Sequence, residues 1–240
     1  IGVGIITCDR PVYLKNLIKT LQDVQIDKLC IVNDGISQIE TNNKIEVINN
    51  VPFKQGVGKT KNKALKYLKD CDYIFLIEDD VIIKNNNVFQ KYIDACIATG
   101  IQHFNYGPGT PFNRKQNVEF DLHNRHELNQ NSEPSPRLTV DYGSLKISLY
   151  AHIAGMFSFF TKQVIASVGL IDEDFYNAWE HVDHTYRIIK AGYHPPFWWF
   201  ADIENSHDCI GQQEEAIKES AIAKDTQEWV ENVKKGSELY

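Results

Sequence analysis

The first hundred residues alternate between short apolar runs and amphipathic stretches, and this alternation constrains the fold more than any other feature of the chain. The apolar runs have strand length, while the stretches between them repeat their apolar residues at helical spacing. Strands that alternate with helices in this way form a parallel sheet covered by helices on both faces. The sequence therefore predicts an α/β fold with a mostly parallel, Rossmann-like sheet flanked by helices, whose strands are expected at residues 1–6, 29–32, 45–48 and 73–80.

The second part of the chain is less regular. Residues 107–137 are rich in Pro, Asn and Gly and are too long for an ordinary connection, so we expect either a mobile, substrate-covering loop or a disordered insertion. Strand-like segments return at residues 138–152 and 156–160, and helices are expected at 177–190 and 216–233. A smaller part of mixed structure should therefore follow the parallel sheet.

Composition places the chain among ordinary globular proteins. Its 240 residues are 42% hydrophobic and 24% charged, which suits one large α/β domain. The net charge of -7 argues against a nucleic-acid partner, which needs a basic surface. The five cysteines are odd in number and widely spaced, so we expect a reducing, cytoplasmic location. No apolar run approaches the length of about 18 residues that a membrane span needs, and the first residue, Ile1, already lies in a strand pattern, which suggests a piece of a longer chain.

Three consecutive carboxylates end the fourth predicted strand: Glu78, Asp79 and Asp80. Neighbouring carboxylates repel one another and raise each other's pKa unless a cation neutralises them. Alternation along the strand puts Glu78 and Asp80 on one face and Asp79 on the other. The triplet indicates a bound divalent metal, with a solvated acidic turn as the alternative.

Residues 55–60, Gln-Gly-Val-Gly-Lys-Thr, imitate a phosphate-binding P-loop. That motif requires a glycine five residues before Gly58, and the residue there is Phe53. We interpret the segment as a glycine turn that opens a helix.

Several segments, in their order along the chain, resemble family 2 glycosyltransferases. They are residues 5–11 (IITCDRP), 31–35 (IVNDG), 58–65 (GKTKNKAL), 76–80 (LIEDD), 154–157 (AGMF), 168–175 (VGLIDEDF), 179–183 (WEHVD) and 187–193 (RIIKAGY). The resemblance implies one GT-A domain over residues 1–240, with a nucleotide-sugar-binding half at 1–105 and an acceptor-binding half at 106–240. It also implies a nucleotide-sugar donor, a divalent Mn or Mg ion, and inversion at the anomeric carbon.

On the donor side, the resemblance places residues against the nucleotide and the metal. Thr7, Asp9 and Arg10 would border the base and ribose, Asp34 would accept a hydrogen bond from uracil, and Lys61 would lend charge to the nucleotide. The alternative for Thr7 and Asp34 is local turn and cap chemistry. The acidic triplet corresponds to the family's D-x-D element, with Glu78 in place of the first aspartate. The resemblance implies that Asp79 faces or supports the ribose. It also implies that Asp80 binds the metal together with His207.

On the acceptor side, a base must take the proton from the attacking hydroxyl. The family position of that base is occupied by His181, and histidine can act as a base near neutral pH. Glu180 and Asp183 are the alternatives, although Glu180 could instead complete a capping box with Asn177. Among the aromatic residues, Trp179 adjoins the proposed base and is our candidate for stacking on a sugar.

The function expected from these features is metal-dependent, inverting transfer of a sugar from a UDP-sugar to a hydroxyl of a glycan acceptor. A nucleotide-sugar-binding module without turnover is the first alternative, because a histidine replaces the expected acid at the base position. A P-loop nucleotide hydrolase is the second.

Overall fold

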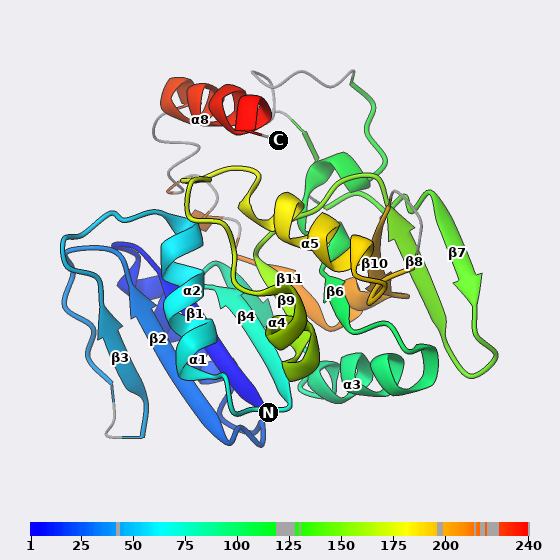
Figure 1. The fold of residues 1–240 in the computed structure, drawn as a ribbon, viewed down its shortest axis with the longest axis horizontal. Helices are drawn as coiled ribbons and strands as arrows, with labels where there is room; N and C mark the ends of the chain where they lie inside the picture. The colour runs from blue at the N-terminus through cyan, green and yellow to red at the C-terminus, as the bar shows by residue number, and fades with distance from the viewer. Residues whose placement is uncertain are drawn as a thin grey trace.

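The computed structural model describes residues 1–41, 44–118, 128–129, 131–195, 199–213, 215–216, 219 and 226–239. A six-stranded sheet with helices on both faces forms its centre (Figure 1). The strand order is β3-β2-β1-β4-β9-β6. Its members are β1 (Gly2–Thr7), β2 (Lys28–Asn33), β3 (Glu46–Asn49), β4 (Tyr73–Glu78), β6 (His103–Asn105) and β9 (Phe157–Thr161). Strands β1 to β4 are parallel, which confirms the predicted sheet, and β9 runs antiparallel to both β4 and β6.

The two faces of the sheet bury different side chains, because residues alternate along each strand. Phe75 and Ile77 of β4 belong to the core formed with α1 (Pro11–Thr20) and α3 (Val88–Thr99). Leu76 belongs to the opposite core, which includes residues of α2 (Val57–Tyr67), α4 (Lys162–Val168) and α5 (Glu180–Lys190). Helix α2 packs closely on the sheet at Gly4, where an added Cβ would lie 2.7 Å from the Cβ of Ala64.

The carboxyl ends of the parallel strands meet at one edge of the sheet. Thr7 lies opposite Asn33, and Asn33 lies opposite Asn49. On the other side of β1, Ile6 lies opposite Glu78. Polar strand ends that are far apart in the sequence are therefore brought together, at the edge where α/β sheets bind ligands.

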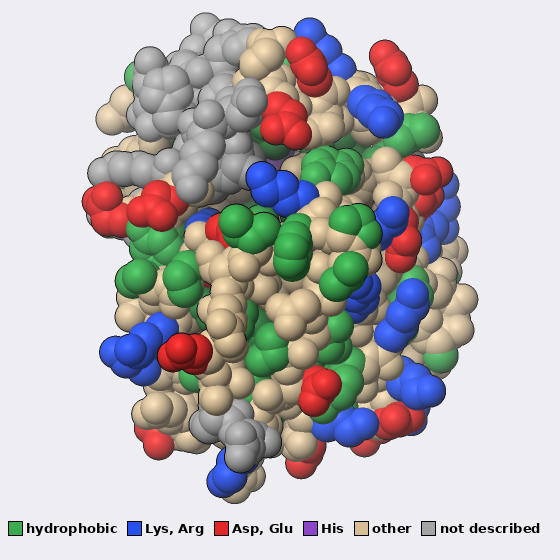
Figure 2. All heavy atoms as spheres, turned by 90° about the vertical axis from the view of Figure 1, so that its left-hand side faces the viewer, with side chains coloured by type: hydrophobic (Ala, Val, Ile, Leu, Met, Phe, Trp, Pro, Cys, Tyr) green, Lys and Arg blue, Asp and Glu red, His purple; other side chains and the backbone are tan. Residues whose placement is uncertain are grey.

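Exposed apolar side chains lie next to the carboxyl ends of β2 and β3. Hydrophobic side chains gather on the side of the molecule that carries β3 (Figure 2). Three exposed apolar residues, Ile36, Val51 and Phe53, follow the ends of β2 and β3. The loops that follow β2 and β3 thus expose apolar side chains.

The second part of the chain forms two smaller antiparallel sheets. One has the order β10 (Phe200–Ile203), β8 (Lys146–Tyr150), β7 (Leu138–Asp141), and the other pairs β11 (Ile210–Gln212) with β5 (Val81–Ile83). The predicted strand at 138–152 is thus two strands joined by a turn. The apolar run at 156–160 becomes β9, which lies within the central sheet.

The predicted loop at 107–137 contains more structure than expected. It includes the 3-10 helices η1 (Gly107–Gly109) and η2 (Pro111–Asn113). The buried amide of Asn113 donates hydrogen bonds to the carbonyls of Gly107 and His152, each at 2.8 Å. The start of this segment is therefore packed, whereas residues 119–127 and 130 lie outside the described chain.

Two helix predictions need correction at their ends. Helix α5 begins at Glu180, and its N-cap is Trp179 with a left-handed φ of 72°. Glu180 is therefore the first helical residue, and the predicted capping box with Asn177 is wrong. At the C-terminal end, α8 (Thr226–Leu239) extends beyond the predicted end at Val233, while residues 217, 218 and 220–225 lie outside the described part.

Among the helices described, none has the length and apolar character needed to cross a membrane.

Candidate active site

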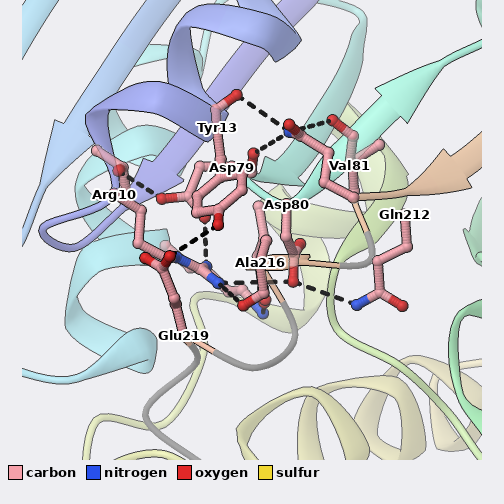
Figure 3. Close-up of polar contacts among 12 residues, drawn as sticks. Arg10, Tyr13, Asp79, Asp80, Val81, Gln212, Ala216 and Glu219 are labelled. Atoms are coloured by element: carbon pink, nitrogen blue, oxygen red, sulfur yellow. Dashed lines mark hydrogen bonds and ion pairs between the residues drawn. The ribbon is translucent and has the colours of Figure 1, made fainter.

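Asp79, in the middle of the acidic triplet, is enclosed by protein. Its side chain is fully buried, the Thr7 hydroxyl donates to Oδ2 at 2.5 Å, and Arg10 forms an ion pair with Oδ1 (Figure 3). Burial raises the pKa of Asp79 to about 7, against the opposing effect of Arg10. Asp79 therefore holds Thr7 and Arg10 in place, and any influence on a ligand passes through these two neighbours.

Asp80 keeps one oxygen without a protein partner. Gln212 lies 3.3 Å from Oδ2, and the Arg10 guanidinium is 3.7 Å from the same atom (Figure 3). Oδ1 is buried and accepts no hydrogen bond from the part of the chain that the structure describes. Burial, and then the nearby Glu78, raise the pKa of Asp80. This carboxylate fits a divalent cation, which would supply the missing partner for Oδ1.

His207 follows β10 and precedes β11. The β5–β11 pairing sets Gln212 opposite Val81, next to Asp80. The backbone carbonyl of His207 accepts from Lys84 at 3.2 Å, and its buried Nδ1 has no hydrogen-bond partner among the described residues. The described residues contain no group of three or more His, Cys, Asp or Glu side chains arranged to hold a metal. A cation at Asp80 would therefore draw other ligands from substrate and water oxygens, and the pairing of His207 with Asp80 stays a prediction.

Asp34 fixes the turn before helix α2. Its Oδ1 accepts from the amide of Asn50 at 2.5 Å and from the backbone of Gln55 at 2.8 Å, and Oδ2 accepts from the backbone of Gly56 at 3.0 Å. A carboxylate at a helix N-terminus is favoured by the helix dipole. Asp34 thus makes the local turn contacts that were the alternative, and its contact with uracil stays a prediction. The same carboxylate occupies the place where a P-loop would hold phosphate, so the hydrolase interpretation does not fit.

Asp9 shapes the turn between β1 and α1. It adopts a left-handed φ of 55°, and Oδ1 accepts from the backbone and the hydroxyl of Ser37 at 2.8 and 2.9 Å. Gly35 packs directly on it, since an added Cβ would lie 2.4 Å from Oδ1 of Asp9. Asp9 therefore joins the loops that follow β1 and β2.

Lys61, expected to face a nucleotide, is instead buried inside the protein, with only 2% of its surface exposed. Nζ lies 3.1 Å from Oε1 of Glu78 and 3.2 Å from Oε1 of Glu180, and it donates to the carbonyl of Gly155 at 3.0 Å. Burial alone would lower the pKa of Lys61, but Glu78 and Glu180 outweigh it and raise the pKa. Lys61 therefore stays charged between Glu78 and Glu180.

Glu180 and His181 form a hydrogen-bonded pair at the start of α5. Oε1 of Glu180 lies 2.8 Å from Nδ1 of His181. Burial would raise the pKa of Glu180, but His181 and Lys61 together lower it well below its usual range. Glu180 is thus an ionised carboxylate that holds a proton on Nδ1, which leaves Nε2 of His181 as the basic nitrogen.

The carboxylate of Asp183 forms an ion pair with Arg187. Its Oδ2 accepts from Nε of Arg187 at 2.7 Å, one turn along the helix. Arg187 also donates to the carbonyls of Val168 and Leu170 at 3.3 and 3.0 Å. Asp183 therefore helps to fix α5 to the segment after α4 and is the least suited of the three candidates to act as a base.

Trp179 packs against the C-terminal helix. Its indole nitrogen donates to the carbonyl of Val233 at 3.0 Å. An added Cβ at Gly236 would lie 2.6 Å from Cδ1 of the indole. The side chain predicted to stack on a sugar is therefore in contact with α8 in this structure.

The segment before that helix lies beside the acidic triplet. Gln213 donates to the carbonyls of Asp79 and Tyr13 at 3.0 and 3.1 Å, and Arg10 donates to the carbonyl of Ala216 at 3.4 Å (Figure 3). Tyr13 also donates to Glu219 at 2.9 Å. Residues from the end of the chain thus contact the residues around Asp79, which the sequence did not indicate.

Comparison of the fold with known structures identifies glycosyltransferases. S. aureus TarS matches with a TM-score of 0.54 at 14% identity, over 78% of this chain and 33% of that chain. A structure of TarS 1–349 matches with a TM-score of 0.51 at 12% identity, over 78% of this chain and 55% of the other. The mannosyltransferase PcManGT from Pyrobaculum calidifontis, in complex with GDP-Man and Mn2+, matches with a TM-score of 0.51 at 8% identity, over 80% and 52%.

This chain has the GT-A-type fold of glycosyltransferases. It spans about half of the length of two of these matched structures and a third of the other. No protein-family model and no curated protein matches the sequence. The comparisons therefore establish the fold, and the activity has to be argued from the site.

Proposed function

We propose that this protein transfers a sugar from a nucleoside-diphosphate sugar to a hydroxyl group of an acceptor, with inversion at the anomeric carbon. The observation that carries the proposal is the arrangement around Lys61. This residue joins an acid at the end of β4 to the Glu180–His181 pair. Within a glycosyltransferase fold, one buried lysine thus links Glu78, in the acidic triplet that contains Asp80, to Glu180, the partner of the proposed base His181.

The donor side supplies charge for a diphosphate. Arg10 is held by Asp79 and has 13% of its side chain exposed. When bound at Asp80, a divalent ion such as Mn or Mg would offset the charge that develops on the leaving diphosphate. The nucleotide is predicted to be UDP, while the matched mannosyltransferase was solved with GDP-Man and Mn2+. Sugars carried by UDP and by GDP should therefore both be tested as donors.

On the acceptor side, His181 is the proposed base. Nε2 takes the proton from the acceptor hydroxyl as its oxygen bonds to the anomeric carbon and the nucleoside diphosphate departs with the bonding electrons. Glu180 stabilises the imidazolium that forms, because its carboxylate faces Nδ1. Glu180 itself is a weak base, since its pKa is lowered by His181 and Lys61 after they overcome the effect of burial.

Release of nucleoside diphosphate from a panel of UDP- and GDP-sugars, with acceptor mixtures and with or without Mn, tests the proposal. We expect metal-dependent release by the wild type and a loss of about 100-fold in Asp80→Asn, a magnitude typical of losing one electrostatic contact to developing charge. Asp94→Asn is the matched control, because Asp94 is exposed on α3 and contacts only Gln90 among the described residues. Metal-independent turnover that Asp80→Asn leaves unchanged would contradict the proposed site.

A binding module without turnover is the second candidate, and the histidine at the position of the expected acid favours it. Calorimetry distinguishes the two functions. Binding of a nucleotide sugar, without transfer to any acceptor or to water, would support the binding module and exclude the transferase.

A further inference from the structure

Lys61 is the one lysine in α2 whose contacts reach both sides of the proposed site. Its three acceptors come from three separate segments: Glu78 at the end of β4, Gly155 before β9, and Glu180 at the start of α5. An ammonium group has three N–H donors, and these contacts use all of them. Lys61 therefore has no donor left for a bound nucleotide.

The cluster leaves little freedom to its members. An added Cβ at Gly155 would lie 2.7 Å from Nζ of Lys61 and 3.1 Å from Nδ1 of His181. Only a residue without a side chain lets the backbone pack so closely on both groups. The ammonium of Lys61 and the imidazole of His181 thus both pack against Gly155.

One oxygen of Glu180 serves two partners. Oε1 accepts from Nζ of Lys61 at 3.2 Å and lies 2.8 Å from Nδ1 of His181. Oε2 is buried and has no hydrogen-bond partner among the described residues. The carboxylate is therefore oriented through Oε1 alone, and removal of either partner would free it to turn.

We propose that Lys61 is a positioning residue, which orients the Glu180 carboxylate toward His181 and ties the acidic end of β4 to the start of α5. This role rests on the proposed function, and it differs from the nucleotide contact expected from the sequence. Lys61 acts through Glu180 and does not touch the reacting atoms.

The charges that face His181 come from few sources. The imidazole borders a cavity of about 10 Å³, roughly the space of one water molecule. The titratable groups that line the same cavity are Lys61 on α2, His103 on β6 and His184 on α5. Burial lowers the pKa of both histidines, so they are neutral at pH 7. Glu180, bonded to Nδ1, and Lys61, which lines the same cavity, are thus two charged groups beside His181.

Removal of Lys61 would leave Oε1 of Glu180 with His181 as its one partner among the described residues. The carboxylate that steadies the imidazolium could then turn away. A positioning role therefore predicts a fall in kcat with little change in the donor KM. A lysine that only stabilised the fold would change the unfolding temperature and leave the kcat of the folded enzyme where it is.

The experiment compares the wild type, Lys61→Met, Lys61→Arg and Lys66→Met. Lys66 is exposed on the same helix and serves as the matched control. For Lys61→Met we expect kcat to fall about 10- to 100-fold, with the donor KM changed less than about threefold. Lys61→Arg, which keeps the charge, should recover most of the lost kcat. A change in donor KM alone, or an unchanged kcat, would overturn the proposal.

A second measurement separates this proposal from the proposed function. The hydrogen-bonded Nδ1–H of His181 can be observed by NMR in the wild type and in Lys61→Met, whether or not any sugar is transferred. A weakened hydrogen bond, seen as a changed Nδ1–H signal, supports the linkage even in a protein without turnover, and an unchanged signal contradicts it. Should Lys61→Met not fold, Lys61→Met/Glu78→Gln removes the cation with one of its two acids and keeps the net charge of the cluster. The same change is expected there, relative to Glu78→Gln.

Discussion

Oε1 of Glu180 lies 2.8 Å from Nδ1 of His181, so two residues adjacent in the chain form one acid–imidazole pair. Neighbouring residues on a helix normally point in different directions. Here the contact occurs at the first turn of α5, directly after Trp179 with its left-handed backbone. The two residues therefore have separate roles: Glu180 remains an ionised carboxylate, and His181 keeps its Nε2 nitrogen available.

Substitution of the two residues should have unequal effects on catalysis. His181→Gln is expected to lower kcat about 10³-fold, because it removes the proposed base. Glu180→Gln should lower kcat about 10²-fold or less, since the amide oxygen can still accept from Nδ1. Single-turnover rates at saturating donor provide the measurement. Asp183→Asn is the comparison, and a larger loss there than in His181→Gln would move the base to Asp183.

Asp34→Ala should destabilise the protein. The change removes the acceptor for the amide of Asn50 and for the backbone of Gln55 and Gly56 at the start of α2. Leaving buried donors without an acceptor typically costs about 1 to 3 kcal/mol, which urea unfolding can resolve. Asp70→Ala, at an exposed site near the end of α2, should change the stability little. Unaltered stability combined with lost nucleotide affinity would instead support the uracil contact.

Stability should fall as the pH is lowered from about 6.5 to 4. Burial lowers the pKa of His184 and of His194 from 6.5 to about 4. Between these values the unfolded chain binds protons that the folded protein excludes, so acidification favours unfolding. Each histidine accounts for at most about 3 kcal/mol across this window.

Urea unfolding at several pH values, for the wild type and His184→Asn, measures this dependence. The variant should show a shallower loss of stability with acid. An equal slope in both proteins would mean that His184 does not contribute.

Gly236→Ala should loosen helix α8 even though alanine is the better helix former. The new methyl group would lie 2.6 Å from the indole of Trp179, so either the helix or the ring has to move. We expect faster hydrogen exchange in α8 than in the wild type. Lys235→Ala, at the exposed neighbouring position, should leave exchange unchanged or slow it. Slower exchange in Gly236→Ala would show that α8 does not rest on Trp179.

The parallel sheet was predictable from sequence because its signals are local. The apolar runs that become β1, β2 and β4 have strand length and end in polar residues, and the observed bounds differ from the predicted ones by one or two residues. Asp80 could likewise be singled out, since three adjacent carboxylates are visible in the sequence alone. The start of α5 was placed too early, because nothing local marks Trp179 as a residue with a left-handed backbone.

The contacts within the site join residues that are far apart in the sequence. The sequence did not indicate these contacts. The acceptors of Lys61 at Gly155 and Glu180 are 94 and 119 residues away. The position of His207 depends on the pairing of β11 with β5, which brings Gln212 to Asp80. Gly155 was part of a recognised segment, but the need for a glycine there follows only from the packing of Lys61 and His181.

The place of β9 in the central sheet bears on how the chain folds as it is synthesised. Strand β9 (Phe157–Thr161) lies between β4 and β6 and pairs with both. Until residue 161 has left the ribosome, the apolar strand β4 has an open hydrogen-bonding edge, and β6 has no neighbour in the sheet. Open edges of this kind invite pairing with other chains. A nascent chain halted between residues 105 and 157 should therefore be the species most prone to aggregate and most dependent on chaperones.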